Sequence, residues 1–115
     1  MSLKMRTREV QEVVVIDLSG QITIGEASAA IRDELRDQVG NGYRKILLNL
    51  AEVTYIDSAG LGELTSGYTS VKNRGGALKL LNLTKRVHDL MQITKLHTVF
   101  DVYDDEKKAL ASFVS

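Results

Sequence analysis

The segment from Ile56 to Gly62 reads IDSAGLG and places a carboxylate, a hydroxyl and two glycines between an apolar run and a helical pattern. The first turn of a helix carries unpaired backbone N–H groups and about half a positive charge, which stabilises an anion placed against it. A phosphate on Ser58 would be such an anion. Asp and Ser are also preferred helix caps worth ~1 kcal/mol, so a cap without further function is the alternative.

The two glycines of this segment favour more than a cap. Gly60 and Gly62 fall in the first turns of the expected helix, where each glycine costs ~1 kcal/mol relative to alanine. That cost suggests a backbone that must stay free of side chains. The close approach of a partner surface is the explanation that we expect.

Hydrophobic spacing predicts the elements that come before this segment. Residues 13–18 (VVVIDL) are rich in β-branched side chains and predict a strand that ends in a turn at residues 19–20. Residues 7–10 are expected to pair with this strand as a hairpin. From residue 26 to residue 39 every fourth residue is apolar, which predicts an amphipathic helix. The glycines that follow are typical of a helix end.

The middle of the chain predicts a βαβ unit. Residues 46–50 (ILLNL) and 78–83 (LKLLNL) are nearly continuously apolar, as expected of parallel strands covered on both faces. Between them, apolar residues recur with helical spacing over residues 61–71, and the glycines at 75–76 mark the stop. The segment 56–62 therefore lies just beyond a parallel strand, where open α/β sheets usually place their sites.

The end of the chain predicts two shorter helices separated by a short strand. Thr84 can cap the first helix, the acids at 104–106 fall at the start of the second, and residues 99–102 predict the strand. The alternation predicts an α/β fold, with a mixed, mostly parallel sheet of about five strands packed with about four helices. A length of 115 residues suits one domain, which we expect to span residues 1–115.

The composition narrows the classes of partner. Fifteen basic and fifteen acidic residues leave no formal net charge, so the broad cationic field of a nucleic-acid binder is missing and no direct nucleic-acid partner is expected. No apolar run approaches the ~20 residues of a membrane span. The first residues lack the apolar core of a signal peptide, and the chain has no cysteine. We therefore expect a cytoplasmic protein.

A serine hydrolase and a metal site are weaker interpretations. A nucleophile elbow reads G-x-S-x-G, whereas Ile56 and Asp57 precede Ser58 here, and an ionised acid beside the nucleophile would oppose its activation. His88 and His97 lack the close paired spacing of a helical metal site. We expect no catalytic residue and no bound metal.

Short basic runs are better explained as solvated helix faces. Lys85 and Arg86 open one expected helix and residues 107–108 lie on another, but acids such as Asp89 interleave with them. Contact with RNA or phospholipid is the less simple explanation. The glycines at 75–76 are not followed by Gly-Lys-Ser/Thr, so a helix stop is favoured over a phosphate cradle.

The stretch VTYIDSAGLGEL at residues 53–64 resembles the signature of the anti-sigma factor antagonists of the STAS family. The resemblance extends over nearly all of the chain, to LSGQ at residues 18–21, ILLNL at 46–50 and the glycines at 75–76. It implies the STAS fold in a single STAS domain. It also implies that the protein binds an anti-sigma factor that is a serine kinase, thereby releases a sigma factor, and is inactivated when that kinase phosphorylates the serine.

Each motif position carries over to one residue of this chain. Ser58 resembles the phosphoacceptor and Asp57 its acidic neighbour, which would orient the hydroxyl and the loop. The contact surface at the helix start would comprise Asp57, Ser58, Ala59, Gly60, Leu61 and Gly62. Ala59 stands where many relatives have a second serine, which leaves Ser58 as the only hydroxyl of the motif.

The partners implied by the resemblance supply the chemistry. The kinase would bring ATP, Mg²⁺ and the catalytic base, so we expect no cofactor on this chain. A PP2C-type phosphatase would remove the phosphate from Ser58. The alternative is a non-switching STAS interaction module in a stress-sensing scaffold or a lipid-transport complex, in which Ser58 is a cap.

Overall fold

The computed structural model describes residues 3–114. Its elements in chain order are β1 (Leu3–Val10), β2 (Val13–Ile22), α1 (Glu26–Gly40), β3 (Lys45–Ile56), α2 (Ser58–Asn73), β4 (Ala77–Leu81), α3 (Lys85–Thr94), the 3₁₀ turn η1 (Leu96–Thr98), β5 (Val102–Tyr103) and α4 (Glu106–Ala111). The strands form one sheet in the order β1-β2-β3-β4-β5. Among these described strands, the β1–β2 pair is antiparallel and the other three pairs are parallel. The predicted α/β fold with a mixed, mostly parallel sheet is confirmed.

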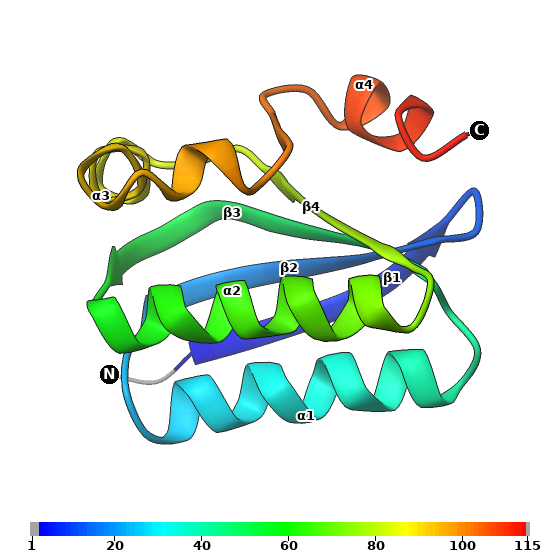
Figure 1. Cartoon of the computed structure of the whole chain (residues 1–115), viewed down its shortest axis with the longest axis horizontal. Coiled ribbons are helices and arrows are strands. Elements are labelled where there is room, and N and C mark those ends of the chain that lie inside the picture. Colours follow the sequence, from blue (N-terminus) through cyan, green and yellow to red (C-terminus); the bar gives the residue numbers. More distant parts are fainter. Residues whose placement is uncertain (1–2, 115) are drawn as a thin grey trace.

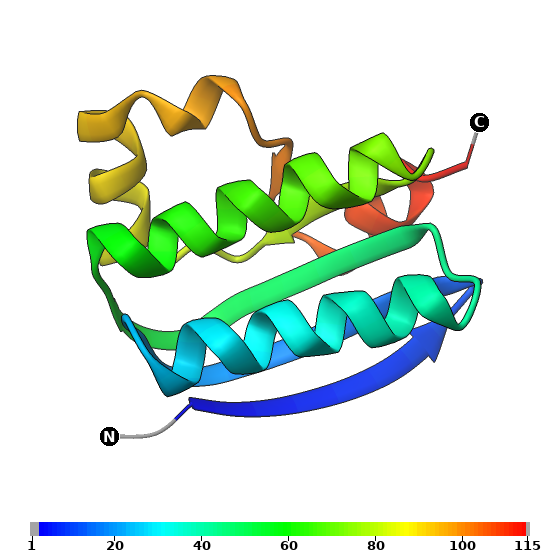
Figure 2. The same cartoon turned by 60° about the horizontal axis from the view of Figure 1, so that its bottom comes forward.

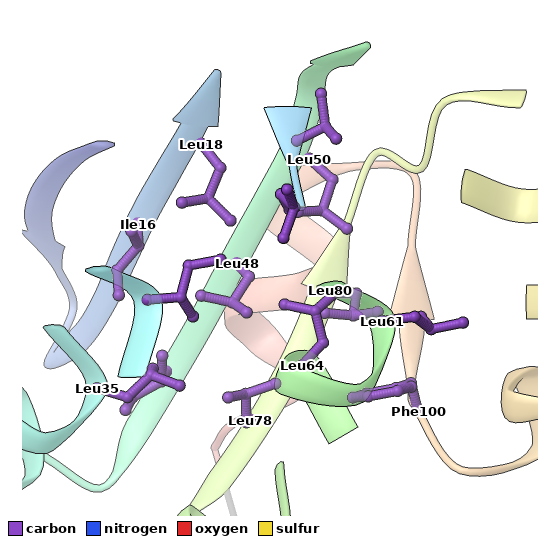
Figure 3. Close-up of a cluster of buried hydrophobic side chains, with 14 of the residues drawn as sticks. Ile16, Leu18, Leu35, Leu48, Leu50, Leu61, Leu64, Leu78, Leu80 and Phe100 are labelled. Carbon is purple, nitrogen blue, oxygen red and sulfur yellow. The ribbon is translucent and has the colours of Figure 1, made fainter. Parts of the chain in front are cut away.

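The helices lie on both faces of the sheet. Helices α1 and α2 run side by side against one face, and α4 lies on the opposite face (Figures 1 and 2). The main core fills the space beneath α1 and α2, where leucines from β3, α2 and β4 meet (Figure 3). Helix α3 contributes Val87 and Met91 to the same core. This burial fixes the position of α3 next to the beginning of α2.

Strand β3 is covered on both faces, as its apolar sequence predicts. Leu48 points into the main core, whereas the neighbouring Leu47 points into a smaller core beneath α4. That smaller core also contains Leu110 and Phe113 from the end of the chain. Successive side chains of a strand point to opposite faces, so a strand buried on both faces must be apolar at consecutive positions.

Several predicted strand boundaries were wrong. Strand β1 begins at Leu3 instead of residue 7, β3 continues beyond residue 50 to Ile56, and β4 ends at Leu81 instead of residue 83. Strand β2 does not turn at residues 19–20 but continues to Ile22, because irregularities in its pairing with β3 absorb the Ser-Gly step and Gly20 adopts a positive φ of 112°. The last strand comprises residues 102–103 instead of 99–102, since Phe100 is buried in the main core. The extension of β2 matters for function because Ile22 pairs with Ile56, the first residue of the IDSAGLG segment.

The helix caps follow the predicted chemistry. The Thr84 hydroxyl accepts a hydrogen bond from the Val87 N–H at 3.4 Å, and the Asp105 carboxylate accepts one from the Lys108 N–H at 3.1 Å. Within residues 3–114, none of the helices combines the length and the apolar character that crossing a bilayer requires.

Candidate functional site

Asp57, and not Ser58, caps helix α2. One oxygen of the Asp57 carboxylate accepts a hydrogen bond from the Gly60 N–H at 2.7 Å, and the other accepts one from the Ile24 N–H at 3.3 Å. Its backbone N–H donates to the Ile22 carbonyl at 3.3 Å. Asp57 therefore ties the β2–α1 loop to the beginning of α2. Ser58 is the first helical residue and is exposed, so the hypothesis that Ser58 is the cap was wrong.

The two glycines of the motif have different surroundings. Gly60 is buried, and a Cβ on it would overlap the backbone carbonyl of Ile22. The domain itself therefore requires this glycine, which corrects the expectation that partner contact requires both. Gly62 is exposed, and a Cβ there would meet open space. Only Gly62 remains a candidate for close approach by a partner.

The predicted contact surface divides in the same way. Ser58, Ala59 and Gly62 are exposed and Asp57 is partly exposed, whereas Leu61 is 2% exposed and belongs to the main core. The exposed positions lie on the first turns of α2. Leu61 anchors these turns from below and exposes almost no surface of its own.

A hollow between α2 and α3 lies beside Ser58. Tyr55, Ile56, Asp57 and Ser58 line one side of it, and Lys85, Arg86, Asp89, Leu90 and Ile93 of α3 line the other. The Arg86 guanidinium lies 4.4 Å from the centre of the Tyr55 ring. Lys85 forms an ion pair of 2.9 Å with Asp89. The sequence showed these charges but not the hollow, because Tyr55 and Arg86 are far apart in the chain.

Two isoleucines next to the site are exposed to solvent. Ile24 is 76% exposed and is held near α2 by its hydrogen bond to Asp57. Ile93 is 79% exposed and lines the hollow. Large apolar side chains that flank a polar centre are typical of protein–protein contact surfaces. Sequence reasoning missed both residues, because an apolar residue type does not by itself show whether its side chain is buried or exposed.

A second groove lies between α1 and α2. The Arg32 guanidinium reaches across it to the Glu63 carboxylate at 2.7 Å. Glu63 is only 9% exposed, and its hydrogen bond raises the pKa of Arg32. This ion pair neutralises a largely buried carboxylate and links the two helices below the exposed turns of α2.

The two histidines, His88 and His97, do not contribute to the lining of the hollow beside Ser58. His88 contacts Asp89 at 3.5 Å, and His97 contacts the Met91 carbonyl at 3.4 Å. The described part of the chain contains no cluster of three His, Cys, Asp or Glu side chains that could hold a metal ion.

Comparisons with known proteins agree with this geometry. The anti-sigma-B factor antagonist of Bacillus subtilis is 29% identical over 102 residues, which are 89% of this chain and 92% of that protein. The crystal structure of a candidate anti-sigma factor antagonist from Thermotoga maritima matches with a TM-score of 0.88 at 25% identity, and the match covers 96% of this chain and 95% of the Thermotoga chain.

The fold is also that of SpoIIAA from Bacillus. Its structure in the phosphorylated form matches this chain with a TM-score of 0.73 at 22% identity, and the match covers 95% of this chain and 98% of the SpoIIAA chain. The family model described as the STAS domain matches residues 4–109. With the mixed sheet, the Asp57-capped helix and this match taken together, the chain belongs to the STAS domain family.

Proposed function

We propose that this protein is an anti-sigma factor antagonist that binds an anti-sigma factor serine kinase and is switched off by phosphorylation of Ser58. Its relatives named as anti-sigma factor antagonists support the class of function. The observation that carries the switch is local. Ser58 is exposed at the first position of α2, while the neighbouring Asp57 performs the capping. The serine hydroxyl is therefore free for modification.

The phosphorylation step requires little from this chain. The Ser58 Oγ attacks the γ-phosphorus of ATP bound to the kinase, the bond between that phosphorus and the bridging oxygen breaks, and ADP leaves. The hydroxyl proton passes to a base of the kinase. This chain supplies the nucleophile on a rigid helix start, which Asp57 holds through its bonds to Gly60 and Ile24.

The switch follows from charge and space. A phosphate adds about −1.5 to −2 charge units, which the beginning of a helix tolerates well. The domain therefore stays folded. A kinase packed over Ala59 and Gly62 has no room for the added group, so the complex is lost. A PP2C-type phosphatase would restore binding when it hydrolyses the phosphoserine.

Phosphate mapping tests this function. The protein is incubated with its candidate anti-sigma factor kinase and ATP·Mg²⁺, and the modified residue is located by mass spectrometry. We expect one phosphate on Ser58 and none after Ser58→Ala. Ser66→Ala is the matched control, because Ser66 is an exposed serine on the same helix, and it should leave labelling unchanged.

Two other outcomes would contradict the proposal. Phosphate on Ser66 or Thr65 in place of Ser58 would move the switch away from the helix start. A complex that persists in the presence of ATP·Mg²⁺ without phosphorylation of this chain would favour the constitutive interaction module of a scaffold or a lipid-transport complex. In that case the exposed surface around Ile24 and Gly62 would serve binding alone.

A further inference from the structure

We propose that Arg86 receives the phosphate of phosphorylated Ser58 across the hollow between α2 and α3. The inference rests on the proposed function and assigns a phosphate-binding residue to the inactive state. Both side chains line the same hollow, Ser58 from the beginning of α2 and Arg86 from the first turn of α3. The phosphoseryl oxygens would extend from Ser58 into this shared hollow.

The neighbours of Arg86 leave its guanidinium available to bind an anion. Its guanidinium lies over the Tyr55 ring, 4.4 Å from the ring centre, and this cation–π contact leaves the N–H donors available. Within residues 3–114 it forms no ion pair, whereas the adjacent Lys85 is paired with Asp89 at 2.9 Å. A guanidinium edge fits two oxygens of one phosphate, which a lysine cannot match. Arg86 is therefore the better placed of the two cations.

The local charge balance requires such a cation. The Asp57 carboxylate is next to Ser58, and its bonds to the Gly60 and Ile24 N–H groups hold it there. A phosphate of about −1.5 to −2 charge units would stand beside this negative charge. The helix dipole offers only about half a positive charge. In addition, the Gly60 N–H at the helix start already donates to the Asp57 carboxylate and is not available to the phosphate. Arg86 supplies the missing positive charge.

The contact would also explain how a small group blocks a large surface. A phosphate held between Ser58 and Arg86 fills the mouth of the hollow, which Ile93 also lines. Phosphorylation then changes both the helix start and the neighbouring face of α3. A partner that uses Ile93 would lose its contact as well as the close approach over Gly62.

The test is a ³¹P NMR titration of protein that carries phosphoserine at position 58, introduced during translation so that no kinase is needed. Arg86 favours the dianion, so the second pKa of the phosphoserine should lie below its ordinary value of about 6. Arg86→Ala should raise this pKa by roughly half a unit or more. The other charged groups lining the hollow, Asp57, Lys85 and Asp89, are unchanged in that variant.

Arg74→Ala is the matched control, because Arg74 is an exposed arginine at the far end of α2 and does not line this hollow. It should leave the pKa within about a tenth of a unit, since exposed charges beyond a Debye length are screened. The ¹H shift of the Arg86 Nε–H should move downfield on phosphorylation in the wild type. Circular dichroism checks that each variant is folded.

An unchanged phosphoserine pKa in Arg86→Ala, or an equal shift in Arg74→Ala, would overturn the inference. Neither result would affect the proposed function, which depends on kinase labelling of Ser58. Conversely, absence of kinase labelling would defeat the proposed function whatever the titration shows.

Discussion

Arg8 lies in β1 and is half-buried, whereas Arg86 lies in α3 and is exposed, and the surroundings of the two arginines differ. Arg8 donates hydrogen bonds to both oxygens of Asp17, at 2.8 and 3.1 Å, and to both oxygens of Glu106, at 3.0 and 2.7 Å. Asn49 donates a further bond to Asp17 at 2.8 Å. Arg86 has an aromatic ring beneath it and no carboxylate partner within residues 3–114.

The different surroundings indicate different roles for the two arginines. Arg8 links β1, β2 and α4, and its donors are used within the domain. Arg86 lies on an open hollow beside Ser58, and its donors remain available to a group that arrives later. A network whose hydrogen-bond donors are all used stabilises one folded state. A cation with available donors near a modification site can instead bind a negative charge that is added there.

The largest effect should come from the glycine that the domain needs. Gly60→Ala places a Cβ against the Ile22 carbonyl. Because this backbone carbonyl cannot rotate away as a side chain could, we expect a loss of ~3 kcal/mol in the free energy of unfolding. Gly62→Ala meets open space and should be neutral or stabilising by up to ~1 kcal/mol. Urea denaturation measures both. Equal stabilities would refute the division of the motif into an inner and an outer glycine.

Gly62→Arg tests the outer glycine through binding. The added side chain points into solvent and leaves the fold intact, but it should weaken kinase affinity by about 100-fold if the partner packs over this position. Asn73→Arg adds the same group at the exposed end of α2 and serves as the control in calorimetric titrations. If both variants bind like the wild type, the partner docks elsewhere.

Removal of Arg8 should cost more stability than removal of Arg86. Arg8→Ala leaves Asp17 and Glu106 without their cation, and because these side chains are 28% and 36% exposed, we expect a loss of about 1–2 kcal/mol, less than for a fully buried pair. Arg86→Ala should change the stability of the unmodified protein by less than ~0.5 kcal/mol. Thermal and urea unfolding compare the two. A reversed order would invalidate the contrast between the arginines.

A smaller effect is expected in the pH dependence of stability. Hydrogen bonds from Arg8 lower the pKa of Asp17 and of Glu106. A carboxyl group with a lowered pKa contributes stability above its unfolded value of about 4, and this is lost as the pH falls through the folded value. The melting temperature should therefore decrease as the pH is lowered from about 5, and the decrease should be less steep in Arg8→Ala. Parallel curves for the two proteins would show that Arg8 does not hold these carboxylates.

Much of the fold could be predicted because its signals are periodic and local. The helical spacing of α1 and α2 and the apolar strand β3 follow from residues close together in the sequence. The end of β2 was missed because the Ser-Gly step can form either a turn or a strand irregularity, and pairing with the distant β3 decides between them.

The candidate site was predictable in its position but not in its division of roles. Asp57 and Ser58 are both good capping residues, and only the observed helix start shows which one caps. The requirement for Gly60 comes from Ile22, and the arrangement of Arg86 comes from Tyr55. These contacts join residues distant in the chain, which local patterns do not encode.

The central claim is tested most directly by the affinity of the kinase for four forms of the protein: unmodified, phosphorylated on Ser58, Ser58→Ala and Ser58→Asp. Because Asp57 provides the cap, Ser58→Ala should keep its stability within ~0.5 kcal/mol and bind the kinase as the unmodified protein does. Ser58→Asp should bind partly, since it carries less charge than phosphoserine. The phosphorylated protein should remain folded and bind at least about tenfold more weakly. Equal affinity of the phosphorylated and unmodified proteins would contradict the account.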